Sequence, residues 1–299
     1  MKRIILTGAT GMIGSTLVEL AVHQGYEVVC IVRKNSQRLD SIISSPLVHI
    51  IEADLSDLKT LDVPYRCDQF FHFGWDRTAN ANRDEVETQM QNVQYTLDAA
   101  RLAKRCGCTV FVGAGSQAEY GPTASKLMVE TPVHPESGYG IAKLSAGLFS
   151  RLLCQQLSIK FNWIRILSAY GPRDGAQTLI TYLLKTVKEG KNPELTPCEQ
   201  TWDYIYATDV AHAFFAVADK GKDGKIYPLG SGRGEKLREY VNIIIKAINP
   251  SVSPLFGVKP YYPHQPMFLV ADISEIKGDT GWSPKISFDE GIQRLITSS

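Results

Sequence analysis

The amino-acid sequence predicts an α/β protein with a doubly wound parallel sheet. Over residues 3–110, short runs of β-branched and aromatic residues alternate with helix-like segments, which is typical of parallel strands joined by crossover helices. The first run ends in a glycine-rich turn that opens an amphipathic helix. Beyond residue 166 the alternation becomes irregular and the chain richer in Pro, Gly and Tyr, which indicates a second, smaller unit.

The strands are expected where apolar runs are bounded by turn residues. Five of them are predicted to be buried on both faces of the sheet, at 4–7, 27–32, 48–51, 69–73 and 109–113. A sixth strand is expected at 161–167. Two long helices are predicted at 84–105, where apolar residues recur with a helical period, and at 137–157.

The composition shift also predicts the domain organisation. Residues 1–166 are expected to form the first domain and residues 167–299 most of the second. A core strand and helix pattern returns at 205–218, so we expect the chain to come back to the first domain near 203–218. The two domains are therefore predicted to be interleaved.

The bulk composition excludes several classes of function. A formal net charge of +1, from 32 basic and 31 acidic residues, gives no global field that would attract nucleic acid or anionic lipid. The six cysteines and six histidines lack the spacing of a metal site, so no metal is expected. No apolar run approaches the ~20 residues that cross a bilayer. We expect a cytoplasmic protein that binds small molecules.

The glycine-rich turn has the features of a dinucleotide site. It directly follows the first strand, and its glycines allow a tight turn, a close approach to a pyrophosphate and close packing of helix on strand. The positive end of the helix would face the phosphates. The residues expected to bind the dinucleotide here are Gly8, Thr10, Gly11, Met12, Ile13 and Gly14.

Residues after the next strands indicate which dinucleotide is preferred. An acidic side chain after the second strand would bind the adenosine ribose, but this chain has Arg33, followed by Lys34, Ser36 and Arg38. Guanidinium groups pair with phosphate, so NADP(H) is favoured over NAD(H), with a solvated basic loop as the alternative. Further contacts to the dinucleotide are expected from Asp54, Leu55, Phe73, Gly74 and Trp75.

A tyrosine and a lysine at the start of the second long helix predict the proton chemistry. Tyr139 and Lys143 are four residues apart, which places them on one helix face. The phenol would need its pKa of about 10 depressed to act as acid and base near neutrality, and Lys143 together with the nicotinamide is expected to depress it. Ser116 follows the fifth strand at the carboxyl edge of the sheet, where its hydroxyl would reach the reacting oxygen.

These segments together resemble the extended short-chain dehydrogenase/reductase family, with its NAD-dependent epimerases, dehydratases and ketoreductases of nucleotide sugars. Asn92-Val93 and the segments 165–172, 203–211 and 281–284 also follow the family order. The resemblance implies a Rossmann domain, a C-terminal substrate domain and a homodimer built from the two long helices. It also implies that Ser116, Tyr139 and Lys143 are catalytic, with Asn92 as a weaker fourth member.

The resemblance also narrows the reaction. Dehydratases of the family carry an Asp-Glu pair where this chain has Gln117 and Ala118, which cannot act as acid and base. Arg33 then favours a nucleotide-sugar 4-ketoreductase of the 4-keto-6-deoxyhexose type. A 4-epimerase with tightly bound NAD is the alternative, and a non-catalytic protein that senses the dinucleotide is a further one.

The substrate side departs from the family pattern. Ser168 and Trp202 stand where the family commonly has an asparagine and an arginine that hold phosphates, and 263–266 replaces another arginine. The resemblance therefore leaves the nucleotide part of the substrate open, and a reductase of another carbonyl compound remains an alternative. The residues expected to contact substrate are Gln117, Ser168, Arg173, Trp202 and Arg233.

Overall fold

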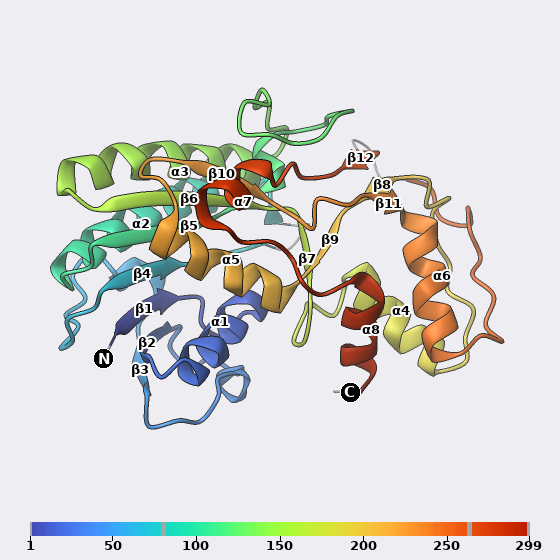
Figure 1. The fold of residues 1–299 in the computed structure, drawn as a ribbon, viewed down its shortest axis with the longest axis horizontal. Helices are drawn as coiled ribbons and strands as arrows, with labels where there is room; N and C mark the ends of the chain where they lie inside the picture. Colours follow the sequence, from blue (N-terminus) through green and yellow to red (C-terminus); the bar gives the residue numbers. More distant parts are fainter. Residues whose placement is uncertain (1, 79–81, 262–264, 298–299) are drawn as a thin grey trace.

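The computed structural model describes residues 2–78, 82–261 and 265–297, and a parallel sheet of seven strands lies at its centre (Figure 1). The strand order is β10-β6-β5-β4-β1-β2-β3, and every neighbouring pair is parallel. The predicted doubly wound α/β fold is confirmed. The strands are β1 (Arg3–Thr7), β2 (Glu27–Val32), β3 (Val48–Glu52), β4 (Gln69–His72), β5 (Val110–Ser116), β6 (Lys160–Ile166) and β10 (Ile226–Leu229).

Helices cover both faces of this sheet. On one face lie α1 (Met12–His23) and α5 (Ala207–Lys220), which pack on each other, with α7 (Ser274–Thr280) beside α5. On the other face lie α2 (Val86–Arg105) and α3 (Gly138–Leu157). Both long helices occur where they were predicted. The second one begins one residue later than expected because Ser137 is its N-cap and accepts the Gly140 N–H.

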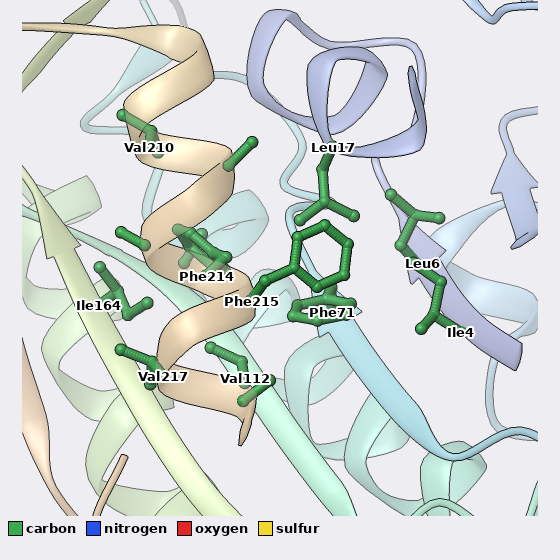
Figure 2. Close-up of a cluster of buried hydrophobic side chains, with 14 of the residues drawn as sticks. Ile4, Leu6, Leu17, Phe71, Val112, Ile164, Val210, Phe214, Phe215 and Val217 are labelled. Atoms are coloured by element: carbon green, nitrogen blue, oxygen red, sulfur yellow. The ribbon is translucent and has the colours of Figure 1, made fainter. Parts of the chain in front are cut away.

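Aromatic side chains fill the core under α5. Figure 2 shows the ring of Phe215 of this helix beside Phe71 of β4 and Leu17 of α1, and Phe214 of the same helix belongs to the same core. The rings of Phe71 and Phe215 meet edge to face, with centroids 5.4 Å apart. This packing holds α5 against the main sheet. About forty residues of chain lie between the end of β6 and the start of α5.

The prediction that the third strand is buried on both faces was wrong. β3 is the edge strand of the sheet, and its residues are half-buried or exposed. Ile50 is 48% exposed. The apolar run resembled that of the central strands, but an edge strand has a neighbour on one side only and less cover from helices.

The remaining elements form the smaller part of the molecule, at the right of Figure 1. Strand β7 (Ser168–Tyr170) pairs with β9 (Tyr204–Tyr206). A small sheet contains β11 (Glu235–Lys236), β8 (Thr201–Trp202) and β12 (Phe268–Leu269). An aromatic core that includes Tyr240 lies among α4 (Leu179–Lys188), α6 (Leu237–Ile248) and α8 (Phe288–Thr297).

The chain passes between the two parts more often than expected. Besides α5, the strand β10 and the helix α7 return to the main sheet. The sequence pattern had not indicated β10. The domain division at residue 166 stays a prediction. None of the helices in the described ranges is long and apolar enough to cross a membrane.

Candidate functional site

A cleft of about 1150 Å³ opens at the carboxyl ends of the central strands. It begins at the turn after β1, passes the ends of β2 and β4, and reaches the start of α3 and the segment after β6. Every residue predicted to bind the dinucleotide lines this single cleft. The cleft lies where doubly wound sheets bind ligands, at the carboxyl ends of the strands beside the point between β1 and β4 where the strand order reverses.

The turn after β1 has room for a ligand but not for larger side chains. Gly8 has a positive φ of 72°, and a Cβ on Gly14 would lie 2.1 Å from the Gly8 carbonyl oxygen. The turn and α1 can approach each other this closely only with glycine at position 14. Gly11 is the N-cap of α1 and supplies no side chain to cap it, so N–H groups of the first turn are left to bind phosphate. The donor set fits a dinucleotide.

The far end of the cleft, past β2, is basic. Arg33, Ser36 and Arg38 line it, whereas the Lys34 ammonium turns away and pairs with Asp57 at 2.8 Å. The Arg38 guanidinium donates to the Arg173 carbonyl oxygen at 2.9 Å. Two arginines are therefore available at the position where the adenosine ribose of a dinucleotide would lie.

The three predicted catalytic side chains line the opposite part of the cleft. Ser116 is the last residue of β5, and its Oγ accepts the Ala118 N–H at 3.2 Å. Tyr139 and Lys143 lie in the first two turns of α3, as their spacing predicted. Ser116, from the end of β5, thus lines the same cleft as Tyr139 and Lys143 of α3.

Burial and one cation dominate the electrostatics of Tyr139 in the free enzyme, and the expected depression of its pKa by Lys143 together with the nicotinamide stays a prediction. Burial raises the pKa of Tyr139, opposed by the Arg83 guanidinium, which lies 4.7 Å from the centre of the phenol ring, and by the Ser116 hydroxyl. Lys143 donates to the Ala114 carbonyl oxygen at 2.7 Å and lies 3.7 Å from the ring centre of Trp75. Burial lowers the pKa of Lys143 to about 7.

Asn92 has a different environment from the other three. It is buried in α2 and does not line the cleft. Its side-chain oxygen accepts the Asp76 N–H at 2.8 Å, and its amide nitrogen donates to the Asp76 carbonyl oxygen at 3.0 Å. Asn92 therefore holds the segment after β4 in place, and its catalytic role stays a prediction.

The residues predicted to contact substrate do not all come together. Gln117 and Ser168 line the cleft, whereas Arg173, Trp202 and Arg233 do not. Arg173 pairs with Glu19 at 3.4 Å, and Trp202 packs in β8. Arg233 is exposed on the loop that precedes β11. Of the segment 263–266, residues 263 and 264 lie outside the described residues.

Two arginines of the site were missed by the sequence reasoning. Arg77 and Arg83 line the cleft from the segment between β4 and α2. The Arg83 carbonyl oxygen accepts the Tyr139 N–H at 2.7 Å, and the Asp84 carboxylate accepts the Gly138 N–H at 2.7 Å. A position directly after a central strand could have pointed to Arg77. The packing of Arg83 against Tyr139 is a tertiary contact that leaves no local signal.

Comparison with known proteins agrees with this geometry. Residues 4–230 match the model of the NAD dependent epimerase/dehydratase family. UDP-glucuronic acid decarboxylase 1 of Arabidopsis thaliana is 26% identical over 99% of this chain and 69% of its own length. UDP-glucose 4-epimerase of Mycolicibacterium smegmatis is 24% identical over 98% of this chain and 97% of its own.

The fold has close structural counterparts as well. A UDP-N-acetylglucosamine 4-epimerase from Methanobrevibacter ruminantium M1, solved with UDP-N-acetylmuramic acid, superposes with a TM-score of 0.89 at 19% identity, over 100% of this chain and 99% of the other. At this identity the likeness concerns the fold. The family match covers most of the chain, and the glycine-rich turn, Ser116, Tyr139 and Lys143 all line one cleft. The chain therefore belongs to the NAD-dependent epimerase/dehydratase family and is an enzyme of the extended short-chain dehydrogenase/reductase type.

Proposed function

We propose that this enzyme is a reductase of 4-keto nucleotide sugars, of the 4-keto-6-deoxyhexose type, and that it uses NADPH. The observation that carries the proposal is the basic end of the cleft, where Arg33, Ser36 and Arg38 line the site expected for the adenosine ribose. Guanidinium groups bind phosphate through paired charge-assisted hydrogen bonds, so this end favours a 2′-phosphate.

The state of Tyr139 suits reduction. Bound NADPH supplies the hydride. Burial raises the pKa of the phenol, so Tyr139 carries its proton at neutral pH. A protonated phenol can give that proton to the carbonyl oxygen as the oxygen gains negative charge, and can regain one from solvent. Ser116 would hold the same oxygen by donating a hydrogen bond. Gln117 and Ala118 offer no acid or base for loss of water.

The substrate side of the cleft supports a nucleotide sugar. A volume of about 1150 Å³ exceeds that of a site for one drug-sized ligand and leaves space for a sugar beside the dinucleotide. Gln117 and Ser168 would contact the sugar. We further propose that Trp202 and Arg233 contact the nucleotide end, which would then extend beyond the cleft. Arg173 lies beside Arg38 at the end proposed for the adenosine ribose and is not part of this proposal.

The test uses the purified enzyme with NADPH or NADH and a set of 4-keto-6-deoxy nucleotide sugars. We expect oxidation of NADPH to exceed that of NADH by at least about tenfold, since one lost contact to a charged group costs about 1.5–3 kcal/mol. Tyr139→Phe should keep cofactor binding and lose turnover. No NADPH oxidation with any member of the set would contradict the proposal.

A 4-epimerase is the second candidate. The alignment with the M. smegmatis UDP-glucose 4-epimerase spans nearly both chains, and Ser116, Tyr139 and Lys143 would serve oxidation and re-reduction equally. An enzyme of this kind retains its cofactor between turnovers. NAD released on denaturing the purified protein, together with interconversion of C4 epimers without added cofactor, would favour this candidate over the reductase.

We also propose that the enzyme is a homodimer. Helices α2 and α3 pack side by side, and their outer faces expose apolar side chains, with Met90 67% and Phe149 55% exposed. Large exposed apolar surface marks association sites. The α3 residues follow a helical spacing on one face. The exposed apolar residues of the two helices are Val86, Met90, Ile141, Leu148, Phe149 and Leu152.

Light scattering on the eluting protein tests the dimer. Phe149→Asp should give a monomer, because a buried carboxylate would have no partner at the centre of the interface. Val258→Asp is the matched control, since Val258 is 56% exposed but lies away from α2 and α3. A parent protein that elutes as a monomer would contradict the proposal.

A further inference from the structure

A buried carboxylate lies directly behind Ser116. Glu119 is completely buried, and each of its oxygens accepts at least one hydrogen bond. Its Oε1 accepts the Ser116 N–H at 2.8 Å and the Trp163 Nε1–H at 2.9 Å. Its Oε2 accepts the Arg165 Nε–H at 2.7 Å. Trp163 and Arg165 come from β6, so this network joins the end of β5 to the neighbouring strand.

The chain makes room for this network. A Cβ on Gly115 would lie 2.3 Å from Trp163 Nε1 and 2.5 Å from Glu119 Oε1, and one on Gly113 would lie 2.2 Å from the Trp163 ring. The two glycines of β5 therefore let the indole lie across the strand and reach the carboxylate. The contact between Trp163 and Glu119 therefore depends on glycine at both 113 and 115.

Stability alone is a weak reason for such a network. Burying an ion pair such as Glu119–Arg165 costs desolvation energy that the attraction between the charges barely offsets, and apolar residues of similar volume are often as stable. The location offers a better reason, since one of the three donors is the backbone N–H of Ser116 itself.

The network holds Ser116 from both sides. The Ser116 N–H is held by Glu119, and its Oγ accepts the Ala118 N–H, which leaves the hydroxyl hydrogen free to be donated. The same turn packs against α3, because a Cβ on Gly140, next to Tyr139, would lie 2.4 Å from the Ala118 carbonyl oxygen. The turn that carries Ser116 is thereby packed closely against the first turn of α3, which carries Tyr139.

We propose that Glu119 is a positioning residue, which acts through Ser116 and is kept in place by Arg165 and Trp163. The inference rests on the proposed function, because Ser116 acts there on the carbonyl oxygen. Glu119 itself is buried and lies outside the set of residues that line the cleft. Its effect on turnover should therefore depend on Ser116.

A double-mutant cycle tests this dependence. Glu119→Gln keeps the shape and removes the charge. With its one remaining oxygen toward the Arg165 guanidinium, it places an NH₂ group, which cannot accept, against the Ser116 N–H and the Trp163 Nε1–H. We expect kcat to fall by about 10- to 100-fold, as for small misplacements of reacting groups, with KM for NADPH within about twofold. In a Ser116→Ala background the same change should cost less than about threefold. Equal losses in both backgrounds would mean that Glu119 has a structural role only.

Asp203→Asn is the matched control. Asp203 is equally buried and accepts hydrogen bonds from the Ser231 hydroxyl and the Ser231, Gly232 and Ala271 N–H groups, away from Ser116. Asp203→Asn should lower the melting temperature. Any change in kcat that it causes should be the same in the parent enzyme and in the Ser116→Ala variant. If Glu119→Gln does not fold, Arg165→Lys replaces it, because it keeps the charge and removes the Nε–H contact.

A second readout needs no substrate. The chain has four tryptophans, so a ¹⁵N-indole NMR spectrum is simple, and Trp163→Phe assigns the Trp163 signal. We expect this N–H to exchange slowly and to shift upfield in Glu119→Gln. The Ser116 amide should lose protection from hydrogen exchange in the same variant.

The two readouts separate the possible failures. Unchanged Ser116 protection in Glu119→Gln would overturn the inference even if no substrate is found. Lost protection together with NADPH turnover and a non-additive cycle would support both proposals. Lost protection without NADPH turnover on any 4-keto sugar would support the positioning of Ser116 and reject the reductase.

Discussion

The cation beside the catalytic phenol offers a quantitative test of the site. The Arg83 guanidinium carbon lies 4.7 Å from the centre of the Tyr139 ring. Two unit charges at that separation interact by about 3.5 kcal/mol at an effective dielectric constant of about 20. Because Arg83 is only half-buried, solvent screens its charge. We therefore expect an interaction energy of about 1–2 kcal/mol between the guanidinium and the phenolate. This corresponds to roughly one pKa unit on Tyr139.

The perturbation is Arg83→Gln, which removes the positive charge and keeps a polar side chain. The pKa of Tyr139 is raised by burial, and Arg83 opposes that rise, so the variant should raise it further. In reduction Tyr139 gives a proton, so activity is present below its pKa and is lost as pH rises through it. The alkaline limb of the kcat/KM profile should therefore move up by about one pH unit.

The assay compares the two pH profiles of NADPH oxidation from neutral to alkaline pH. The phenolate absorbance that is lost in Tyr139→Phe gives the same pKa without a substrate, since it separates Tyr139 from the other twelve tyrosines. The other groups that act on the pKa of Tyr139 are the Ser116 hydroxyl and Glu119, both unchanged in the variant. Lys143, whose Nζ lies 5.9 Å from the ring centre, is unchanged as well. Arg77→Gln is the matched control, because Arg77 lines the same cleft but pairs with Glu85 at 3.0 Å. An alkaline limb that stays in place or moves down would refute the reasoning.

Three further predictions concern the cofactor site and the core. Gly14→Ala would place a Cβ 2.1 Å from the Gly8 carbonyl oxygen, so the turn must open. We expect the variant to fold and to bind the cofactor at least about 100-fold more weakly, as measured by calorimetry. Arg33→Ala combined with Arg38→Ala should weaken NADPH binding by about 10- to 100-fold and leave NADH binding within about threefold; equal losses for both cofactors would contradict a 2′-phosphate site. Phe214→Ala should lower the free energy of unfolding in urea by about 3–5 kcal/mol, because Phe214 is fully buried in the core of Figure 2; a loss below about 1 kcal/mol would show that the core closes over the cavity.

Local features of the fold were predictable because local chain geometry produces them. The glycines at positions 8, 11 and 14 after the first strand predicted the turn, since it needs a positive φ at Gly8 and a close approach of α1 at Gly14. The spacing of Tyr139 and Lys143 is likewise set by the helix period. Parallel strands end at one edge of a sheet, so Ser116 could be expected near them.

Other features depend on which elements become neighbours. The run at 48–51 resembles a central strand, and only the strand order makes β3 an exposed edge. Strand β10 extends the main sheet beside β6 although more than fifty residues separate the two. The sequence also predicted substrate contacts at three residues that the packing leaves outside the cleft, namely Arg173, Trp202 and Arg233.

The sequence by itself determined the α/β class, the dinucleotide turn and the chemical type of the site, because each follows from contacts within about ten residues of chain or from the common direction of parallel strands. Only the tertiary structure decided that the Arg83 guanidinium lies beside the phenol, and that Trp163 and Arg165 donate to Glu119 behind Ser116. The physical reason is that charge effects fall off with distance in space. Arg83 and Tyr139 are 56 positions apart, and Glu119 and Arg165 are 46 apart. Each pair becomes neighbours only when the elements that carry the two residues pack together.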